Sequence, residues 1–344
     1  MTIALAPERS IVCTFEVSDT PHLLSLLGPD GGMAWVQGTP NNQQGIVARG
    51  EVARIELVGP ERFSRAHRWW STWSSTCDGD NPVAFSSFAF SSSPGASVMV
   101  VPEIAIRRSL GKTTATVVGS ASRVAQLKAE IPELLDTANP SFQQKHGVTY
   151  TAGSMPLSQW AAAVDAAIAR ISRGELDKVV LARDLVAQLA GPVDVSALLN
   201  RLNAAFPDCW TFAVDGLIGA TPELLVRRTG DQVTSRVLAG TVHSSADAGK
   251  DGALAAALLG SDKDQEEHAF AVDSVAMALA NHCTDLHVPT RPFVLRLANV
   301  QHLATDVTGE LVDGAPVLAL AASLHPTAAV CGTPSERAKA VIRE

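Results

Sequence analysis

The chain has 344 residues, of which 46% are hydrophobic and 18% are charged, and its formal net charge is −8. This apolar fraction supports a sizeable core and excludes a disordered protein. The acidic balance argues against a dedicated nucleic-acid binder, although a pocket for a small anion can still be locally positive.

The sequence also favours a cytoplasmic protein. Its five cysteines are scattered and form no CxxC, which argues against a disulfide framework or a thiolate zinc site. No basic segment followed by an apolar stretch opens the chain, so we expect no secretory signal. The uncharged stretch at 81–102 contains three prolines, which argues against a membrane helix.

The first 145 residues predict a mainly β region with two helices. Helical spacing of apolar residues predicts helices over 61–73 and 121–135. Short apolar runs between turn residues predict strands of antiparallel sheet at 46–48, 52–57, 83–85, 88–90, 98–101 and 115–118. A polar linker is expected from Asn139 to about Ser154.

The second half begins with a helix that we expect to be capped by Ser158 and to end at Gly174. Helices are also expected over 195–206 and 264–281. The strands expected between and around them are 178–186, 209–214, 217–220, 224–228 and 232–237. Because helices and strands mix without a βαβ rhythm, we predict an α+β fold with large antiparallel sheets and helices packed outside.

Several segments of this half place polar groups among apolar residues. Lys178 begins a strand whose next three residues are apolar, so its amine would be partly desolvated, which favours a base. A surface lysine paired with Asp177 is the ordinary alternative. Glu223 stands between apolar runs, where a carboxyl holds its proton and can act as an acid, although a turn glutamate would look the same.

The long helix opens with Asp264 and Glu267, three residues apart and therefore on one face. Such carboxylates can bind Mg²⁺, or they can simply complement the helix dipole. Further polar positions lie at Gly240 and Thr241 after a strand, at His302, and in the segment 324–332.

Taken in chain order, the segments DKVVLAR, TPELL, LAGT, KDxxEHA, QHL and LHPTxAVxG resemble the chorismate-utilising enzymes. This family includes isochorismate synthase, salicylate synthase and the large subunits of anthranilate and aminodeoxychorismate synthase. The resemblance covers roughly residues 155–335 and implies the fold of anthranilate synthase component I. It implies a chorismate-binding catalytic region over 150–344, preceded by the N-terminal region over 1–145.

The resemblance also implies a role for each matching residue. Lys178 would activate water for attack at C2 of chorismate, and Glu223 would protonate the departing C4 hydroxyl. Glu267 would bind Mg²⁺, with Asp264 nearby. The positions implied to contact the substrate are Gly240, Thr241, His302, Ala329 and Val330.

Two positions distinguish between the activities of the family. Ammonia-using members carry Gln where this chain has Lys178, so water is the implied nucleophile. Salicylate synthases typically carry Thr where Ala329 stands, so release of isochorismate without loss of pyruvate is implied. We therefore expect a monomeric, Mg²⁺-dependent isochorismate synthase serving menaquinone or siderophore biosynthesis. Salicylate synthase and an inactive chorismate-binding relative remain the alternatives.

The resemblance further implies a C-terminal segment with a substrate-binding Arg and another Mg²⁺-binding Glu. The sequence stops at Arg343 and Glu344, before such a segment. We therefore expect the 344-residue chain to be poorly soluble or inactive when expressed as such.

Overall fold

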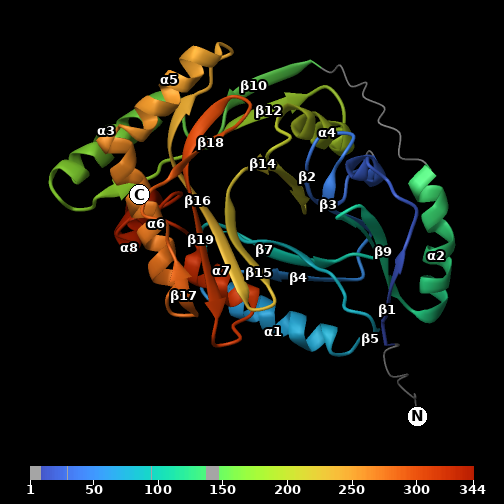
Figure 1. Ribbon diagram of the computed structural model, residues 1–344. Helices are drawn as coiled ribbons and strands as arrows, with labels where there is room; N and C mark the ends of the chain where they lie inside the picture. Colours follow the sequence, from blue (N-terminus) through green and yellow to red (C-terminus); the bar gives the residue numbers. More distant parts are fainter. Residues whose placement is uncertain (1–8, 29, 94, 137–146) are drawn as a thin grey trace. The chain divides into compact units, whose positions relative to one another are not determined.

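The computed structural model describes residues 9–28, 30–93, 95–136 and 147–344 (Figure 1). It divides into two compact units. Unit 1 comprises Met1–Lys145 and Pro192–Pro222, and unit 2 comprises His146–Gly191 and Glu223–Glu344. The segment Pro192–Pro222, which sequence reasoning groups with the catalytic region, is thus part of unit 1.

Unit 1 is built on an eight-stranded sheet in the order β14-β13-β2-β3-β8-β9-β1-β5, antiparallel except for the pair β1 and β5. Its strands are β1 (Ile11–Glu16), β2 (Met33–Gln37), β3 (Gln44–Arg49), β5 (Asp78–Gly79), β8 (Ile104–Ser109), β9 (Lys112–Gly119), β13 (Trp210–Val214) and β14 (Leu217–Thr221). Alternate residues of the central strands turn toward a core with the short 3-10 helix η1 (Leu23–Leu27), α2 (Ala121–Asp136) and α4 (Val195–Ala205).

The other face of this sheet meets a three-stranded antiparallel sheet in the order β4-β7-β6. Its strands are β4 (Ala53–Leu57), β7 (Ser97–Val101) and β6 (Phe85–Ser87), and α1 (Arg62–Ser74) lies against β4. All five residues of β7 are buried. Phe85, Val98 and Val100 share a core cluster with Met33 and Ala48 of the larger sheet, so this uncharged stretch forms packed strands.

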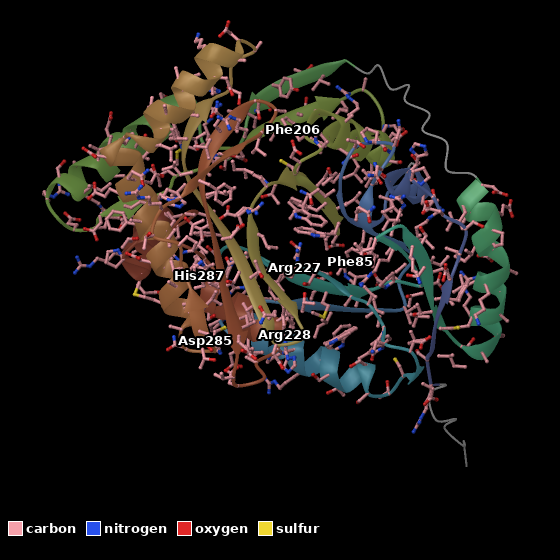
Figure 2. The ribbon with its side chains drawn as sticks, viewed as in Figure 1. Phe85, Phe206, Arg227, Arg228, Asp285 and His287 are labelled. Carbon is pink, nitrogen blue, oxygen red and sulfur yellow. The ribbon has the colours of Figure 1, made fainter. Side chains whose placement is uncertain are left out.

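Unit 2 contains an antiparallel sheet in the order β15-β16-β19-β17, with β18 also paired to β19. The strands are β15 (Leu224–Thr229), β16 (Gln232–His243), β17 (Cys283–His287), β18 (Phe293–Arg296) and β19 (Val300–Leu311). Helices α6 (Asp262–Leu279) and α7 (Val317–Leu324) pack on this sheet around a core that includes Val237, Val275 and Leu320. The guanidinium of Arg228, labelled in Figure 2, donates to the carbonyl oxygens of Gly230, Gly314 and Ala315 and ties the end of β15 to the loop before α7.

Two small ribbons complete unit 2. One pairs β10 (Val148–Ala152) with β12 (Leu185–Leu189), and the other pairs β11 (Lys178–Val179) with β20 (Gly332–Thr333). The remaining helices of this unit are α3 (Leu157–Ser172), α5 (Ala248–Leu259) and α8 (Ser335–Arg343).

The α+β class with large antiparallel sheets is confirmed, and so are the helices expected over 61–73, 121–135, 195–206 and 264–281, to within two residues at each end. A continuous strand over 178–186 is wrong. Lys178 and Val179 pair with β20, whereas Leu185–Leu189 pairs with β10, so two different partners divide the segment.

Three smaller expectations are also wrong. The two strands expected at 83–85 and 88–90 are replaced by the single strand β6. Ser158 does not cap α3, because the helix begins at Leu157 with Pro156 at its N-cap. The linker expected after Asn139 lies outside the described residues up to position 146, and its later part forms β10. Of the described helices, none is long and apolar enough to cross a membrane.

Candidate active site

Lys178 is positioned by the pairing of β11 with β20. Gly332 faces Val179 in the register and has φ +136°, and a Cβ there would lie 2.1 Å from the carbonyl oxygen of Lys178. Glycine therefore allows the two backbones to approach this closely. The Lys178 side chain is only 12% exposed, and its Nζ lies 3.1 Å from Oε1 of Glu267 on α6. This ion pair lacks hydrogen-bond alignment, so the buried Nζ has no hydrogen-bond partner among the described residues.

Glu223 directly precedes β15, and the charge of Lys178 acts on its carboxyl. Burial raises the pKa of this carboxyl to about 7, although the Lys178 ammonium opposes the shift. Burial disfavours the charged carboxylate, and a nearby cation favours it. Because the effect of burial is the larger one, part of the Glu223 population is still protonated near neutral pH, as a general acid requires.

The first two turns of α6 position Asp264 and Glu267. Ser261 caps the helix, its hydroxyl oxygen accepting from the backbone N–H of Asp264 at 3.3 Å. The first turn lies against Gly240, where an added Cβ would be 3.2 Å from the Cβ of Asp264. The absence of a side chain at Gly240 thus lets β16 approach the acidic end of the helix.

Gly240 also forms a bulge in β16. Its φ is +75°, and the register with β19 shifts there, so that Ala239 faces Leu303 and Thr241 faces His302. A bulge of this kind re-aims the following side chain. Thr241 Oγ1 lies 2.9 Å from His302 Nδ1. Burial lowers the pKa of His302, with the Gly240 backbone opposing the shift, so this imidazole is neutral at neutral pH.

Ala329 and Val330 lie in the turn between α7 and β20. Ala329 is partly buried against the core of α6 and α7, whereas Val330 is 47% exposed. The carbonyl oxygen of the next residue, Cys331, accepts from the N–H of Val180 at 2.9 Å. The turn is therefore anchored to the segment that carries Lys178.

All nine residues singled out from the sequence fall in unit 2. Lys178 lies 3.1 Å from Glu267, and its positive charge acts on Glu223. Close contact links Gly240 to Asp264, and Thr241 approaches His302 within hydrogen-bond distance. Ala329 and Val330 are linked to this group only through the backbone of the adjacent turn.

Two carboxylates are available for a divalent cation. Among the described residues no group of three or more His, Cys, Asp or Glu side chains could hold a metal ion by itself. Mg²⁺, however, binds through one or two carboxylates and completes its shell with water and substrate oxygens. The hard oxygens of Glu267 and Asp264 fit that kind of site, whereas they do not form a closed all-protein cage.

Sequence reasoning gave no role to His268, the residue after Glu267. Its side chain is 3% exposed, and its Nε2 lies 2.8 Å from Oγ1 of Thr305 on β19. Burial lowers its pKa. This contact holds the start of α6 on the sheet and so helps to orient Glu267. A histidine inside the KDxxEHA segment was the available signal, but only the fold pairs it with Thr305.

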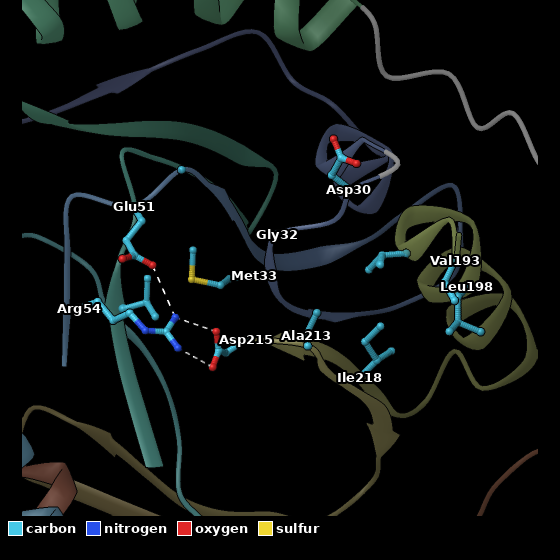
Figure 3. A pocket seen from close by; sticks show the side chains of 14 residues that line it. Asp30, Gly32, Met33, Glu51, Arg54, Val193, Leu198, Ala213, Asp215 and Ile218 are labelled. Carbon is cyan, nitrogen blue, oxygen red and sulfur yellow. Dashed lines mark hydrogen bonds and ion pairs between the residues drawn. The ribbon is translucent and has the colours of Figure 1, made fainter. Parts of the chain in front are cut away.

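Unit 1 contains a cavity of about 510 Å³ in which the one basic residue of the lining, Arg54, is paired with carboxylates (Figure 3). The Arg54 guanidinium binds both carboxylate oxygens of Asp215 at 2.7 and 2.8 Å, and it also contacts Glu56 and Glu51. Valines and Ile218 line the other side. The cation of this cavity is thus already occupied by carboxylates.

Known proteins are similar to this chain in sequence. Isochorismate synthase DhbC of Bacillus subtilis is 37% identical over 253 residues, which are 67% of this chain and 64% of that protein. Isochorismate synthase MenF of the same species is 32% identical over 60% of this chain and 45% of its own length. This chain therefore matches between about half and two thirds of these relatives.

Solved structures show the same fold. The menaquinone-specific isochorismate synthase MenF of Escherichia coli superposes with a TM-score of 0.75 at 27% identity, covering 97% of this chain and 78% of that one. Anthranilate synthase component I of Streptococcus pneumoniae TIGR4 has a TM-score of 0.59 at 17% identity, covering 99% and 78%, which supports the fold alone. The family model for chorismate binding enzymes matches residues 9–344, and the chain belongs to that family.

Proposed function

We propose that this protein is an isochorismate synthase, which converts chorismate to isochorismate. The observation that carries the proposal is the buried amine of Lys178 next to Glu223, whose pKa of about 7 leaves it able to donate a proton. Membership of the chorismate-binding family and the isochorismate synthases among its relatives support the same reaction.

The proposed reaction needs one base and one acid. The Lys178 ammonium first gives a proton to solvent, and its amine then accepts a proton from water while the water oxygen forms a bond to C2 of the ring. The ring double bonds shift, the C4–O bond breaks, and Glu223 gives its proton to the departing hydroxyl. One water enters and one leaves, so the product is an isomer of the substrate. Each group then returns to its starting protonation state through solvent.

Glu267 and Asp264 are proposed to hold Mg²⁺, which when bound would neutralise the ring carboxylate of the substrate and offset developing charge. Glu267 also positions Lys178, because the two side chains are 3.1 Å apart. His268 holds the start of α6 against β19 through Thr305 and keeps both carboxylates in place.

The remaining residues are proposed to bind and orient the substrate. Gly240 leaves room beside α6, and Thr241 and His302 present a hydroxyl and a neutral imidazole from adjacent strands. Ala329 and Val330 border the site from the turn before β20. Ala329 has no hydroxyl, which favours release of isochorismate over elimination of pyruvate.

The location, oligomeric state and pathway of the protein are part of the same proposal. We propose a cytoplasmic monomer whose catalytic region lies in 150–344 and which acts in menaquinone or siderophore biosynthesis. Chromatography of the products after incubation with chorismate and Mg²⁺ tests the activity. Isochorismate as the product supports the proposal. Salicylate with pyruvate identifies a salicylate synthase, and unchanged chorismate contradicts an active synthase.

A further inference from the structure

A row of side chains crosses the large sheet of unit 1 on the face opposite its helices. The register aligns Phe212 of β13 with Trp35 of β2, Trp35 with Ile46 of β3, and Ile46 with Arg107 of β8. Residues that face each other in register point to the same side of a sheet. The row therefore runs from two aromatic rings through an aliphatic side chain to a cation.

The aromatic end of the row is a stacked platform. The Trp35 ring lies 5.4 Å from that of Trp210 with an interplanar angle of 17°, and 6.0 Å from that of Phe212. The Phe212 ring lies across Gly219 of β14, where a Cβ would be 2.6 Å from it. Glycine at this position leaves room for the Phe212 ring beside β14. Trp35 and Phe212 nevertheless remain only partly buried.

This row forms one wall of a cavity of about 410 Å³, and β6 with the residues just before it lines the cavity too. Phe85, labelled in Figure 2, is the buried aromatic residue of that segment, and Ser86 and Ser87 follow it. The cavity is large enough for a small molecule, since such sites usually start near 300 Å³. Arg107 is the charged residue of its lining.

Arg107 differs from its neighbour Arg108 in having no side-chain partner among the described residues. On the opposite face, Arg108 binds the Asp19 carboxylate at 2.8 Å and also donates to Asn42 and to the carbonyl oxygen of Gln43. Arg107 is exposed and is one of the residues that line the cavity. The donors of Arg107 are therefore available to a ligand that enters the cavity.

We propose that this cavity is a binding site for a small carboxylate that carries a planar ring, such as an aromatic carboxylate. A guanidinium pairs with a carboxylate through two parallel hydrogen bonds, and its plane suits that geometry. A planar ring packs on the faces of Trp35 and Phe212 in an offset or tilted arrangement. The proposal does not rest on the proposed catalytic function, because all residues that line the cavity belong to unit 1.

Benzoate is the simplest probe of the site, with benzamide as its neutral isostere and benzylamine as its cationic counterpart. Ligand-observed NMR titration of the full chain measures each dissociation constant without reference to turnover. We expect benzoate to bind at least about tenfold more tightly than benzamide, the effect of one charge-assisted pair. Equal affinities, or no saturable binding of benzoate at millimolar concentration, would overturn the proposal.

Substitutions then locate the site. Arg107→Gln should remove the preference for benzoate, and Arg107→Glu should reverse it in favour of benzylamine. The matched control is Arg49→Gln, an exposed arginine at the end of β3 that does not line the cavity. Circular dichroism confirms that each variant is folded. A preference that survives both Arg107 substitutions, or that Arg49→Gln also removes, contradicts a site at Arg107.

Discussion

At the scale of single residues, Lys178 is the group on which the proposed chemistry depends most. Replacing it with Ala removes the base but keeps the pairing of β11 with β20, which uses only backbone atoms. We expect turnover of chorismate to fall by about 10²- to 10⁴-fold. Steady-state rates of an active wild-type preparation and of the variant measure this, with the exposed Lys250→Ala as the control. Near-normal turnover in Lys178→Ala would make Lys178 a structural residue.

Glu267 is the residue expected to govern the magnesium requirement. Glu267→Gln replaces a carboxylate with a neutral amide, which is a poorer ligand for a hard cation. The Mg²⁺ concentration that gives half-maximal activity should therefore rise. Glu266→Gln, one residue earlier and exposed, is the matched control. If both variants show the wild-type Mg²⁺ titration curve, Glu267 does not bind Mg²⁺. It then acts only by pairing with Lys178 and by complementing the helix dipole.

Ala329 tests the choice of product. Ala329→Thr adds a hydroxyl and a methyl group at the edge of the proposed site, and we expect some salicylate and pyruvate to form. A coupled lactate dehydrogenase assay detects the pyruvate. Ala322→Thr, an exposed position on α7, controls for the substitution itself. Absence of pyruvate in Ala329→Thr would show that another position sets the product.

At the scale of elements, the ribbon of β11 and β20 depends on Gly332. A Cβ at this position would clash with the Lys178 carbonyl oxygen, and its φ of +136° strains any other residue. Gly332→Ala should therefore lower the thermal unfolding midpoint and also displace Lys178. Gly252→Ala on α5 meets no atom within 4 Å and should raise stability slightly, since Ala favours helix. Equal midpoints for Gly332→Ala and the wild type would mean that the ribbon adjusts without cost.

The elements also show what the sequence could predict. Helices with a strong 3.6-residue period, such as α1 and α6, were found because periodicity is a local property. The division of 178–186 between β11 and β12 could not be found in the same way, since it depends on partners more than 30 residues away in sequence for β12 and more than 150 for β11. Strand pairing of this kind is decided by tertiary contacts.

The candidate site follows the same pattern. Lys178, Glu223 and Glu267 were singled out by their residue types and neighbours. The fold brings Lys178 within 3.1 Å of Glu267 and lets its charge act on Glu223. The contact of His268 with Thr305 and the bulge at Gly240 needed the register of β16 with β19. A bulge shifts this register by one residue, and no local composition specifies where that occurs.

At the scale of the whole molecule, the buried Glu223 links stability to pH. Its pKa is raised from 4.5 to about 7 in the folded state, chiefly by burial. Below pH 4.5 the Glu223 carboxyl is protonated in both the folded and the unfolded state, so folding does not have to bury a charge. Between 4.5 and about 7 the folded state binds more protons than the unfolded state, and the unfolding free energy falls as pH rises. Above about 7 the loss is complete, because the folded carboxyl is then ionised as well.

Glu223→Gln removes this titration and keeps the size of the side chain. We expect the variant to gain stability relative to the wild type as pH rises from 4.5 to about 7, and to keep that gain at higher pH. Urea unfolding of both proteins across this range measures the difference at each pH. Other groups, including His302 with its lowered pKa, contribute equally to both proteins and cancel. The exposed Glu310→Gln is the control and should show a difference that does not change with pH. A pH-independent difference for Glu223→Gln would contradict the raised pKa, and with it the proton donor on which the proposed mechanism depends.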